Sequence, residues 1–135
     1  MTPNDSDVIQ ATGRRKTSVA QVRMVRAGQG KILVNSVPVD DFFGGHERHK
    51  LHAIEPLKVT EGTTSYDVAI RVTGGGVTGQ AGAIRHGIAR ALAKLADATK
   101  RSMRKGGFLT RDDRMVERKK SGQPKARKRF QFSKR

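Results

Sequence analysis

Four glycines within six residues are the part of this chain whose residue type and spacing best suit phosphate binding. They lie in the segment Gly74-Gly75-Gly76-Val77-Thr78-Gly79-Gln80. Glycine lets a backbone approach a phosphate closely, and a helix that follows offers free N–H groups at the positive end of its dipole. Gly74, Gly76 and Gly79 also satisfy the G-x-G-x-x-G pattern of dinucleotide-binding loops. Three interpretations follow: a nucleotide site, a turn without ligand, or a loop held against a polyanion.

The segments on either side of the glycines decide between these interpretations. Large apolar residues stand at every second position of 66–72, and the segment is rich in β-branched residues, which predicts a strand. From Gln80 to about Ala96, apolar residues recur at helical spacing. No second strand follows to complete a βαβ unit, because the chain continues into the basic segment 100–107. Gln80-Ala81 also stands where a Walker loop needs Lys and Ser or Thr, so the polyanion interpretation is favoured.

The overall charge points to the same kind of partner. The 135 residues include 28 Lys and Arg against 12 Asp and Glu, which gives a net charge of +16. Positive side chains in such excess repel one another in a compact fold, and this favours a polyanionic ligand. There are six aromatic residues and no Trp, so binding of single strands by base stacking is poorly supported. Without cysteine, a membrane-length apolar run or a signal-peptide pattern, we expect a soluble intracellular protein.

The charge is concentrated near the C-terminus. Residues 100–135 hold 15 basic and three acidic residues, whereas residues 1–99 hold 13 and nine. The first part can therefore fold as an ordinary small domain, while the second part cannot bury enough apolar surface to order itself alone. We expect a frayed N-terminus over residues 1–7, a folded domain over 8–109 and an extended basic tail over 110–135.

A cationic loop near the N-terminus is a second candidate for phosphate binding, after the glycine loop. Residues 8–11 begin a strand that leads into Thr12-Gly13-Arg14-Arg15-Lys16-Thr17-Ser18. Three consecutive cations beside hydroxyl groups suit a phosphate-binding edge, and a solvated turn is the alternative. Residues 19–26 and 31–35 predict two further strands, joined to each other as a hairpin.

The middle of the chain predicts a helix over residues 46–57. Its apolar residues Leu51, Ile54 and Leu57 should face inward, and Pro56 should end it. This helix contributes to the core of the expected domain.

Metal binding and catalysis lack candidate sites. His46, His49 and His52 recur every three residues, and on a helix this spacing spreads the imidazoles around the axis instead of bringing them together. We expect these histidines to face solvent or RNA. The adjacent acids Asp40-Asp41 and Asp112-Asp113 point apart on any regular element, and no Ser-His-Asp motif occurs. We therefore expect no enzyme, no metal and no cofactor.

Five segments carry a resemblance to a known family. They are residues 12–20, 74–92, 104–112, 116–120 and 131–135. On these segments the chain, from about residue 11 to its C-terminus, resembles the bacterial form of small-subunit ribosomal protein nine. The long block 74–92 together with the matching terminus makes this resemblance specific.

The resemblance implies an α+β fold. It consists of a two-layer domain, with a sheet of about four strands, helices on one side and a left-handed crossover, followed by the extended basic C-terminal tail. The resemblance also implies a place in the head of the 30S ribosomal subunit in the cytoplasm. The expected partners there are 16S ribosomal RNA and neighbouring small-subunit head proteins, with no contact to a membrane.

The resemblance also assigns roles to residues. The family's tail runs toward the peptidyl site and its tip approaches the anticodon stem-loop of tRNA, which here implies tRNA contacts for Ser133, Lys134 and Arg135. Loop and tail cations are expected to replace the counterions of folded RNA. The residues expected to bind ribosomal RNA are Arg14, Arg15, Lys16, Thr17, Gly74, Gly75, Gly76, Gln80, Arg85, Arg90, Arg104, Lys105, Arg111, Arg114, Arg118, Lys119, Lys120, Lys125, Arg127, Lys128 and Arg129.

Two other classes of protein remain as alternatives. A free-standing nucleic-acid chaperone would share the charge but would not need a match across all these segments. A nucleotide-binding enzyme would need a discrete site, which calorimetric titration with ATP or NAD would detect.

Overall fold

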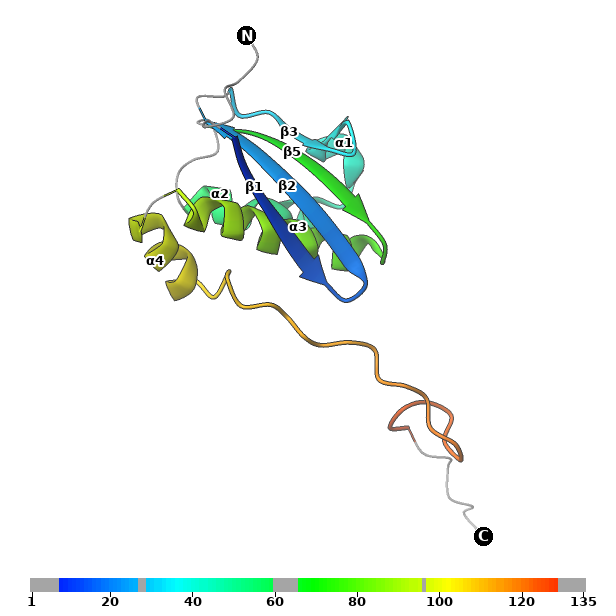
Figure 1. Ribbon diagram of the computed structural model, residues 1–135. Helices are drawn as coiled ribbons and strands as arrows, with labels where there is room; N and C mark the ends of the chain where they lie inside the picture. Colours follow the sequence, from blue (N-terminus) through cyan, green and yellow to red (C-terminus); the bar gives the residue numbers. More distant parts are fainter. Residues whose placement is uncertain (1–7, 27–28, 60–65, 96, 129–135) are drawn as a thin grey trace.

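The computed structural model describes residues 8–26, 29–59, 66–95 and 97–128, which form a sheet, a layer of helices and a C-terminal tail (Figure 1). The strands are β1 (Val8–Arg15), β2 (Ser18–Arg26), β3 (Ile32–Val34), β4 (Val37–Pro38) and β5 (Tyr66–Thr73). The helices are α1 (Val39–Phe42), α2 (Glu47–Val59), α3 (Val77–Ala93) and α4 (Asp97–Lys105). The N-terminus that we expected to be frayed lies outside the described residues.

The five strands form one mixed sheet in the order β1-β2-β5-β3-β4. β1, β2 and β5 are antiparallel neighbours, and β3 runs parallel to β5, with Val22 and Val34 pairing with Ile70 from opposite sides. The hairpin predicted between residues 19–26 and 31–35 is therefore wrong, because β5 lies between β2 and β3. The sheet has one strand more than expected, the two-residue edge strand β4.

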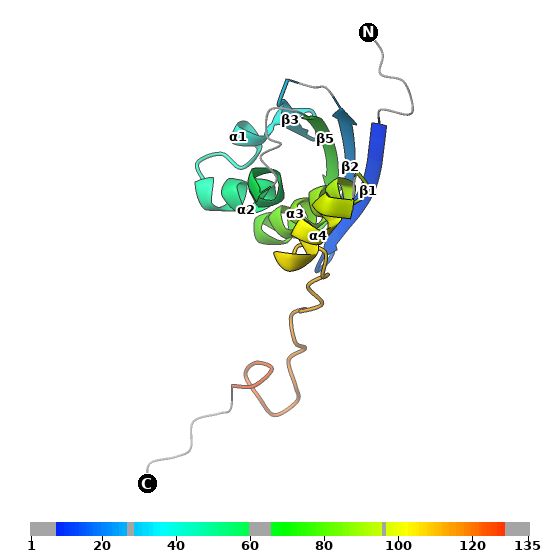
Figure 2. The ribbon, with the colours of Figure 1, turned by 90° about the vertical axis from the view of Figure 1, so that its left-hand side faces the viewer.

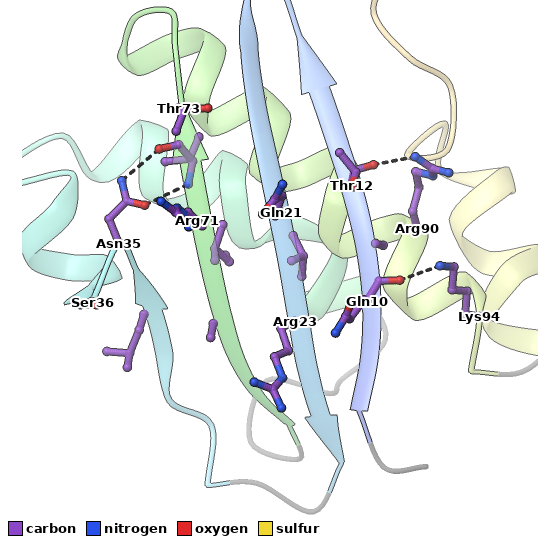
Figure 3. Close-up of a pocket in the computed structure, with 16 residues that line it drawn as sticks. Gln10, Thr12, Gln21, Arg23, Asn35, Ser36, Arg71, Thr73, Arg90 and Lys94 are labelled. Carbon is purple, nitrogen blue, oxygen red and sulfur yellow. Dashed lines mark hydrogen bonds between the residues drawn. The ribbon is translucent and has the colours of Figure 1, made fainter. Parts of the chain in front are cut away.

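The connection from β3 to β5 is a left-handed crossover. Figure 3 looks onto the face of the sheet opposite the helices, and there β5 lies to the right of β3 with both arrows pointing the same way. The chain between them passes through α2, which lies behind the sheet in this view. Most parallel crossovers are right-handed, so this confirms the unusual feature that the resemblance implies. The α+β fold is confirmed as well.

The core lies between the sheet and α3. In β5 the inward residues Val68, Ile70 and Val72 are 2–4% exposed, while the residues between them face solvent. Ile84, Ile88 and Leu92 of α3 are fully buried. The predicted strand and helix that flank the glycines are thus confirmed, although α3 begins three residues earlier than expected.

β1 approaches α3 unusually closely, because a glycine lies on each side of the contact. A Cβ built on Gly13 would lie 2.0 Å from the carbonyl oxygen of Ala83 and 2.2 Å from the nitrogen of Gly87. A Cβ on Gly87 would lie 2.6 Å from Cγ2 of Val22. Real Cβ atoms do not approach so closely, so only glycine fits at either position and β1 stays in place on the helix.

The helical layer differs from expectation in α2. Pro56 does not end the helix, which continues to Val59, and Leu51 is 41% exposed where we expected it to face inward. Proline removes one backbone donor from a helix, but Pro56, Ile54 and Leu57 are buried against the core. Packing therefore outweighs the lost hydrogen bond.

Beyond the domain the chain leaves the core. Met103 of α4 is fully buried and Phe108 is 3% exposed, and they are the last buried residues among those described. Residues 110–128 contain no helix or strand and run away from the sheet and helices (Figures 1 and 2). Within the described residues, no helix is long and apolar enough to cross a membrane.

Candidate nucleic-acid interface

The two predicted cationic and glycine-rich loops lie against each other. β1 and β2 are joined by a two-residue turn at Lys16 and Thr17, and Lys16 has a positive φ of 52°. The hydroxyl of the fully buried Ser18 donates to the carbonyl oxygen of Gly74 at 2.9 Å, and Nε2 of Gln80 donates to the same oxygen at 3.2 Å. A strand turn and a loop 56 residues apart are thus joined by hydrogen bonds.

The glycine loop has the backbone geometry that only glycine adopts without strain. Gly74 and Gly75 have φ values of 76° and 67°, and a Cβ on Gly75 would lie 2.1 Å from the Ser18 hydroxyl oxygen. Gly76 differs: its φ is −98°, and no atom lies within 4 Å of the position of a Cβ. Gly76 precedes α3 without any side-chain cap, so its exposed backbone leads directly into the free N–H groups of the helix.

A pocket of about 200 Å³ lies where β1, α2, α3 and the start of the tail meet. Four of the predicted RNA-binding cations line it, and one acid, Asp112, lies among them. The four cations are Arg14, Arg15, Arg85 and Arg114. A pocket with this surplus of positive charge suits an anionic group.

Arg15 is the member of this pocket that lacks a full set of partners. Its side chain is 19% exposed and lies over Gly82 of α3, where a Cβ would come within 2.2 Å of Cδ of the arginine. Its Nε–H is buried and has no hydrogen-bond acceptor among the described residues, and the nearest acidic atom is Oδ2 of Asp112 at 3.6 Å. Buried polar atoms are normally hydrogen-bonded, so this guanidinium has capacity left for a ligand.

Arg85 has a structural role that the sequence analysis did not assign. Its Nε donates to Oε2 of Glu55 at 3.3 Å, and its guanidinium carbon lies 4.3 Å from the ring centroid of Phe108. The cation–π contact and the ion pair join α2 and α3 to the segment that leads from α4 into the tail.

His86 makes a second link from β1 and α3 to the segment just before the tail. Its Nδ1 accepts a hydrogen bond from the backbone N–H of Arg14, and its Nε2 lies 3.3 Å from the carbonyl oxygen of Leu109. These partners fit the neutral imidazole with the proton on Nε2. Burial lowers the pKa of His86 below its ordinary value and so favours this neutral form. Sequence reasoning missed this link, since nothing local relates residues 14, 86 and 109.

The remaining predicted cations lie apart from the pocket. Arg90 lies at the edge of β1, where its Nη1 donates to the carbonyl oxygen of Thr12 at 2.6 Å. Arg104 and Lys105 end α4, and Arg111 is exposed at the start of the tail. Exposed tail cations follow at Arg118, Lys119, Lys120, Lys125, Arg127 and Lys128. The predicted contacts of Arg129, Ser133, Lys134 and Arg135 lie outside the described residues.

Two of these exposed tail cations form ion pairs with an acid of the tail itself. Glu117 accepts from Lys120 at 2.6 Å and from Arg127 at 2.9 Å, and these contacts lower the pKa of the glutamate. They fold residues 117–127 into a loose turn within the tail.

The described residues contain no group of three or more side chains that could hold a metal ion. The rings of His46 and His49 nevertheless lie 5.7 Å apart. Side chains three residues apart on a helix are neighbours, so the expectation that this spacing spreads the imidazoles around the axis is wrong for this pair. His52 lies elsewhere, in the pocket beside Arg85, where burial and then this arginine lower its pKa.

A small α+β domain with clustered cations at one end, a glycine loop and a basic tail is typical of proteins that bind polyanions. The family profile "Ribosomal protein S9/S16" matches residues 13–135. "Small ribosomal subunit protein uS9" of Chlorobium luteolum is 50% identical over 129 residues, which cover 96% of this chain and 98% of that protein. The protein of the same name from Chlorobium limicola has the same identity and coverage.

The chain therefore belongs to the ribosomal protein S9/S16 family. Membership of this family makes it a structural constituent of the small ribosomal subunit in the cytoplasm and not an enzyme. The dinucleotide interpretation of the glycines and the free-standing chaperone are thereby set aside.

Proposed function

We propose that this protein binds 16S ribosomal RNA in the head of the small subunit, through the end of the domain where the β1–β2 turn, the glycine loop and the start of the tail meet. The tail then continues along the RNA toward the peptidyl-site tRNA, beside neighbouring head proteins. The mechanism is electrostatic: the small core holds cations in register, and they replace counterions of the folded RNA.

The observation that carries this proposal is the buried Nε–H of Arg15, which has no hydrogen-bond acceptor among the described residues. Its pocket is lined by four arginines and a single acid, and Asp112 is shared between Arg15 and Arg114. A phosphate oxygen entering the pocket would supply the missing acceptor. Phosphate contacts of this kind fix position and orientation without reading base sequence.

The exposed backbone at Gly76 supports a second contact in the same interface. With no atom within 4 Å of its Cβ position, this residue leaves room for a ligand directly before the first turn of α3. Phosphate at that position would meet the free N–H groups of the helix.

The test is the affinity of the isolated protein for the head domain of 16S RNA. The Arg14→Gln/Arg15→Gln variant should bind about 10- to 100-fold more weakly, if each lost contact contributes about 1 kcal/mol or somewhat more. The Arg48→Gln/Arg101→Gln variant, which removes the same charge from exposed positions of α2 and α4, serves as the control. Equal losses in both variants, with unchanged melting temperatures, would contradict a specific role for the pocket.

A further inference from the structure

The open face of the sheet is a second cationic surface, on the side opposite α2 and α3 (Figure 3). Its outward side chains, together with Arg90 and Lys94 of α3, line a hollow of about 1350 Å³. Of the residues to which we have given RNA contacts, Arg90 alone lies on this face.

Two arginines, one on each of the adjacent strands β2 and β5, line the hollow without an acid between them. In the register of β2 and β5, Gln21 pairs with Arg71 and Arg23 pairs with Ala69, so the two arginines are diagonal neighbours on adjacent strands. Side chains at diagonal positions of adjacent strands lie about 7–8 Å apart, which is within reach of long side chains such as arginine. No acidic residue lines the hollow within the described part of the chain.

The nearest acid on the same face of β5 is already used by the fold. Asp67 accepts hydrogen bonds from the backbone N–H groups of Gln29 at 2.9 Å and Lys31 at 3.1 Å. These bonds lower the pKa of Asp67 and hold its carboxylate at the end of the sheet. The carboxylate stays charged there, and neither Arg23 nor Arg71 forms an ion pair with it or with any other described acid.

The rim of the hollow adds two more cations and closes the edge of the sheet. Arg90 donates to the carbonyl oxygen of Thr12 and Lys94 to that of Gln10, both at 2.6 Å. Neutral carbonyl groups hold these side chains in place but do not cancel their charge. They also occupy outward carbonyls of the edge strand β1, which disfavours the addition of a further β-strand there.

We propose that this face binds a second segment of RNA backbone, separate from the segment at the glycine loop and pocket. The inference rests on the proposed ribosomal RNA binding and adds a second contact region to it. Gln10, Gln21 and Thr12 offer hydrogen bonds between the cations, as phosphate and ribose hydroxyl groups require. No aromatic side chain lines the hollow among the described residues, so the surface suits a double-stranded segment, which proteins recognise without base stacking.

Acidic protein segments fit this surface less well. Protein interfaces usually have an apolar centre. Here Gln21, Arg23 and Arg71 lie on the adjacent inner strands β2 and β5, and among the described residues of the hollow Leu33, at 38% exposure, is the one large exposed apolar side chain. The polar centre of the face therefore favours RNA over protein.

Site-directed hydroxyl-radical probing tests the proposal, because the chain contains no cysteine. An iron chelate is attached to Gln21→Cys on the open face, to Thr17→Cys at the β1–β2 turn, and to Lys58→Cys on α2 as a control. The three proteins are then assembled into small subunits. We expect Gln21→Cys to cut a segment of 16S RNA that neither of the other two proteins cuts.

Three results would overturn the proposal. Cleavage from Thr17→Cys without any from Gln21→Cys would leave the interface at the glycine loop but refute the second segment. Cleavage of the same segment from both positions would mean that one segment covers both surfaces, and cleavage of a head protein from Gln21→Cys would identify a protein partner. Absence of RNA cleavage from both positions would contradict the proposed function itself.

A charge-removing pair of variants gives an independent readout. Arg23→Gln/Arg71→Gln should lower the magnitude of the log–log salt slope of RNA binding by about 1.4 to 1.8, at roughly 0.7 to 0.9 per phosphate. It should also abolish the cut that is specific to Gln21→Cys. Arg48→Gln/Arg101→Gln should leave that cut in place. Retention of the cut and of the full slope in the open-face variant would overturn the proposal.

Discussion

Nε of Arg15 lies 3.6 Å from Oδ2 of Asp112, so the last residue of β1 is tied to the beginning of the tail. The same carboxylate accepts from Nη2 of Arg114 at 2.8 Å and from its Nε at 2.9 Å. These hydrogen bonds and charges hold the pKa of Asp112 well below its usual range. One acid thus serves two arginines, fixes the direction in which the tail leaves the domain, and leaves Arg15 incompletely paired.

Asp112→Asn should loosen the start of the tail without weakening RNA binding. The substitution removes the charge that joins Arg15 to Arg114, while the surplus of positive charge in the pocket rises. We expect faster tryptic cleavage after Arg111 and Arg114 in the free protein. Asp113→Asn changes the same charge next to it, on a carboxylate that does not join these two arginines, and is the control. Equal cleavage rates in the two variants would contradict this role for Asp112.

Gly75→Ala should destabilise the free domain by about 1–3 kcal/mol, because its φ of 67° is strained for alanine and the new Cβ would meet the Ser18 hydroxyl. Gly76→Ala has neither problem and should melt like the wild type. Its effect should appear instead as weaker RNA binding. Thermal melting and an RNA-binding assay on both variants separate the two roles. A Gly76→Ala variant with normal affinity would remove Gly76 from the interface.

The stability of the free domain should fall as the pH drops below about 6.5, the ordinary pKa of histidine. Burial lowers the pKa of His86 in the folded protein, so the unfolded chain takes up a proton at a higher pH. The stabilisation is fully present above the unfolded pKa and is lost as the pH falls through the folded pKa. A proton on Nδ1 would also remove the acceptor of the Arg14 N–H.

Urea unfolding at several pH values between 5 and 7.5 measures this dependence. His86→Gln should flatten the profile, although His52, whose pKa is lowered by burial as well, keeps a residual slope. His46→Gln, at an exposed ring before α2, should leave the profile as in the wild type. An unchanged slope in His86→Gln would show that this histidine does not link folding to pH.

Much of the central unit could be predicted from sequence, because its signals are local. The alternation of β5, the glycines and the helical period of α3 each specify their own element. The hairpin predicted between β2 and β3 is wrong because strand pairing is not a local property. A glycine-containing connection indicates a turn, but it cannot show that β5, some 40 residues later in the chain, pairs with both strands and separates them. The prediction that Pro56 ends its helix is wrong for a similar reason. It considers only the lost backbone hydrogen bond, whereas burial of Pro56 against the core stabilises the helix beyond it.

The candidate site was predictable as a list of cations but not as an arrangement. Charge and resemblance singled out Arg14, Arg15, Arg85 and Arg114, yet their meeting in one pocket depends on how α3 packs against β1. Gly13 and Gly87 allow that approach, and nothing in their local sequence indicates it. The open-face arginines were missed for a related reason, because their proximity depends on the register of β2 and β5.

Removal of residues 133–135 should leave subunit assembly intact and weaken peptidyl-site tRNA binding by about tenfold or less. Each exposed phosphate contact contributes only about 1 kcal/mol, since solvent and salt screen it. The loss should be equal for all tRNAs, because phosphate contacts carry no sequence information. Filter binding of several tRNAs to small subunits with the shortened protein measures the effect. A defect limited to one tRNA would contradict a pure phosphate contact.

The salt dependence of binding to 16S head RNA tests the electrostatic account most directly. With about six neutralised phosphates, log affinity against log salt concentration should have a slope of about −4 to −5 for the full chain. Removing residues 118–135, which carry nine cations and no acid, should make the slope markedly shallower while the melting temperature stays unchanged. The same slope with and without these residues would contradict the account, because the tail would then make no contact with the RNA.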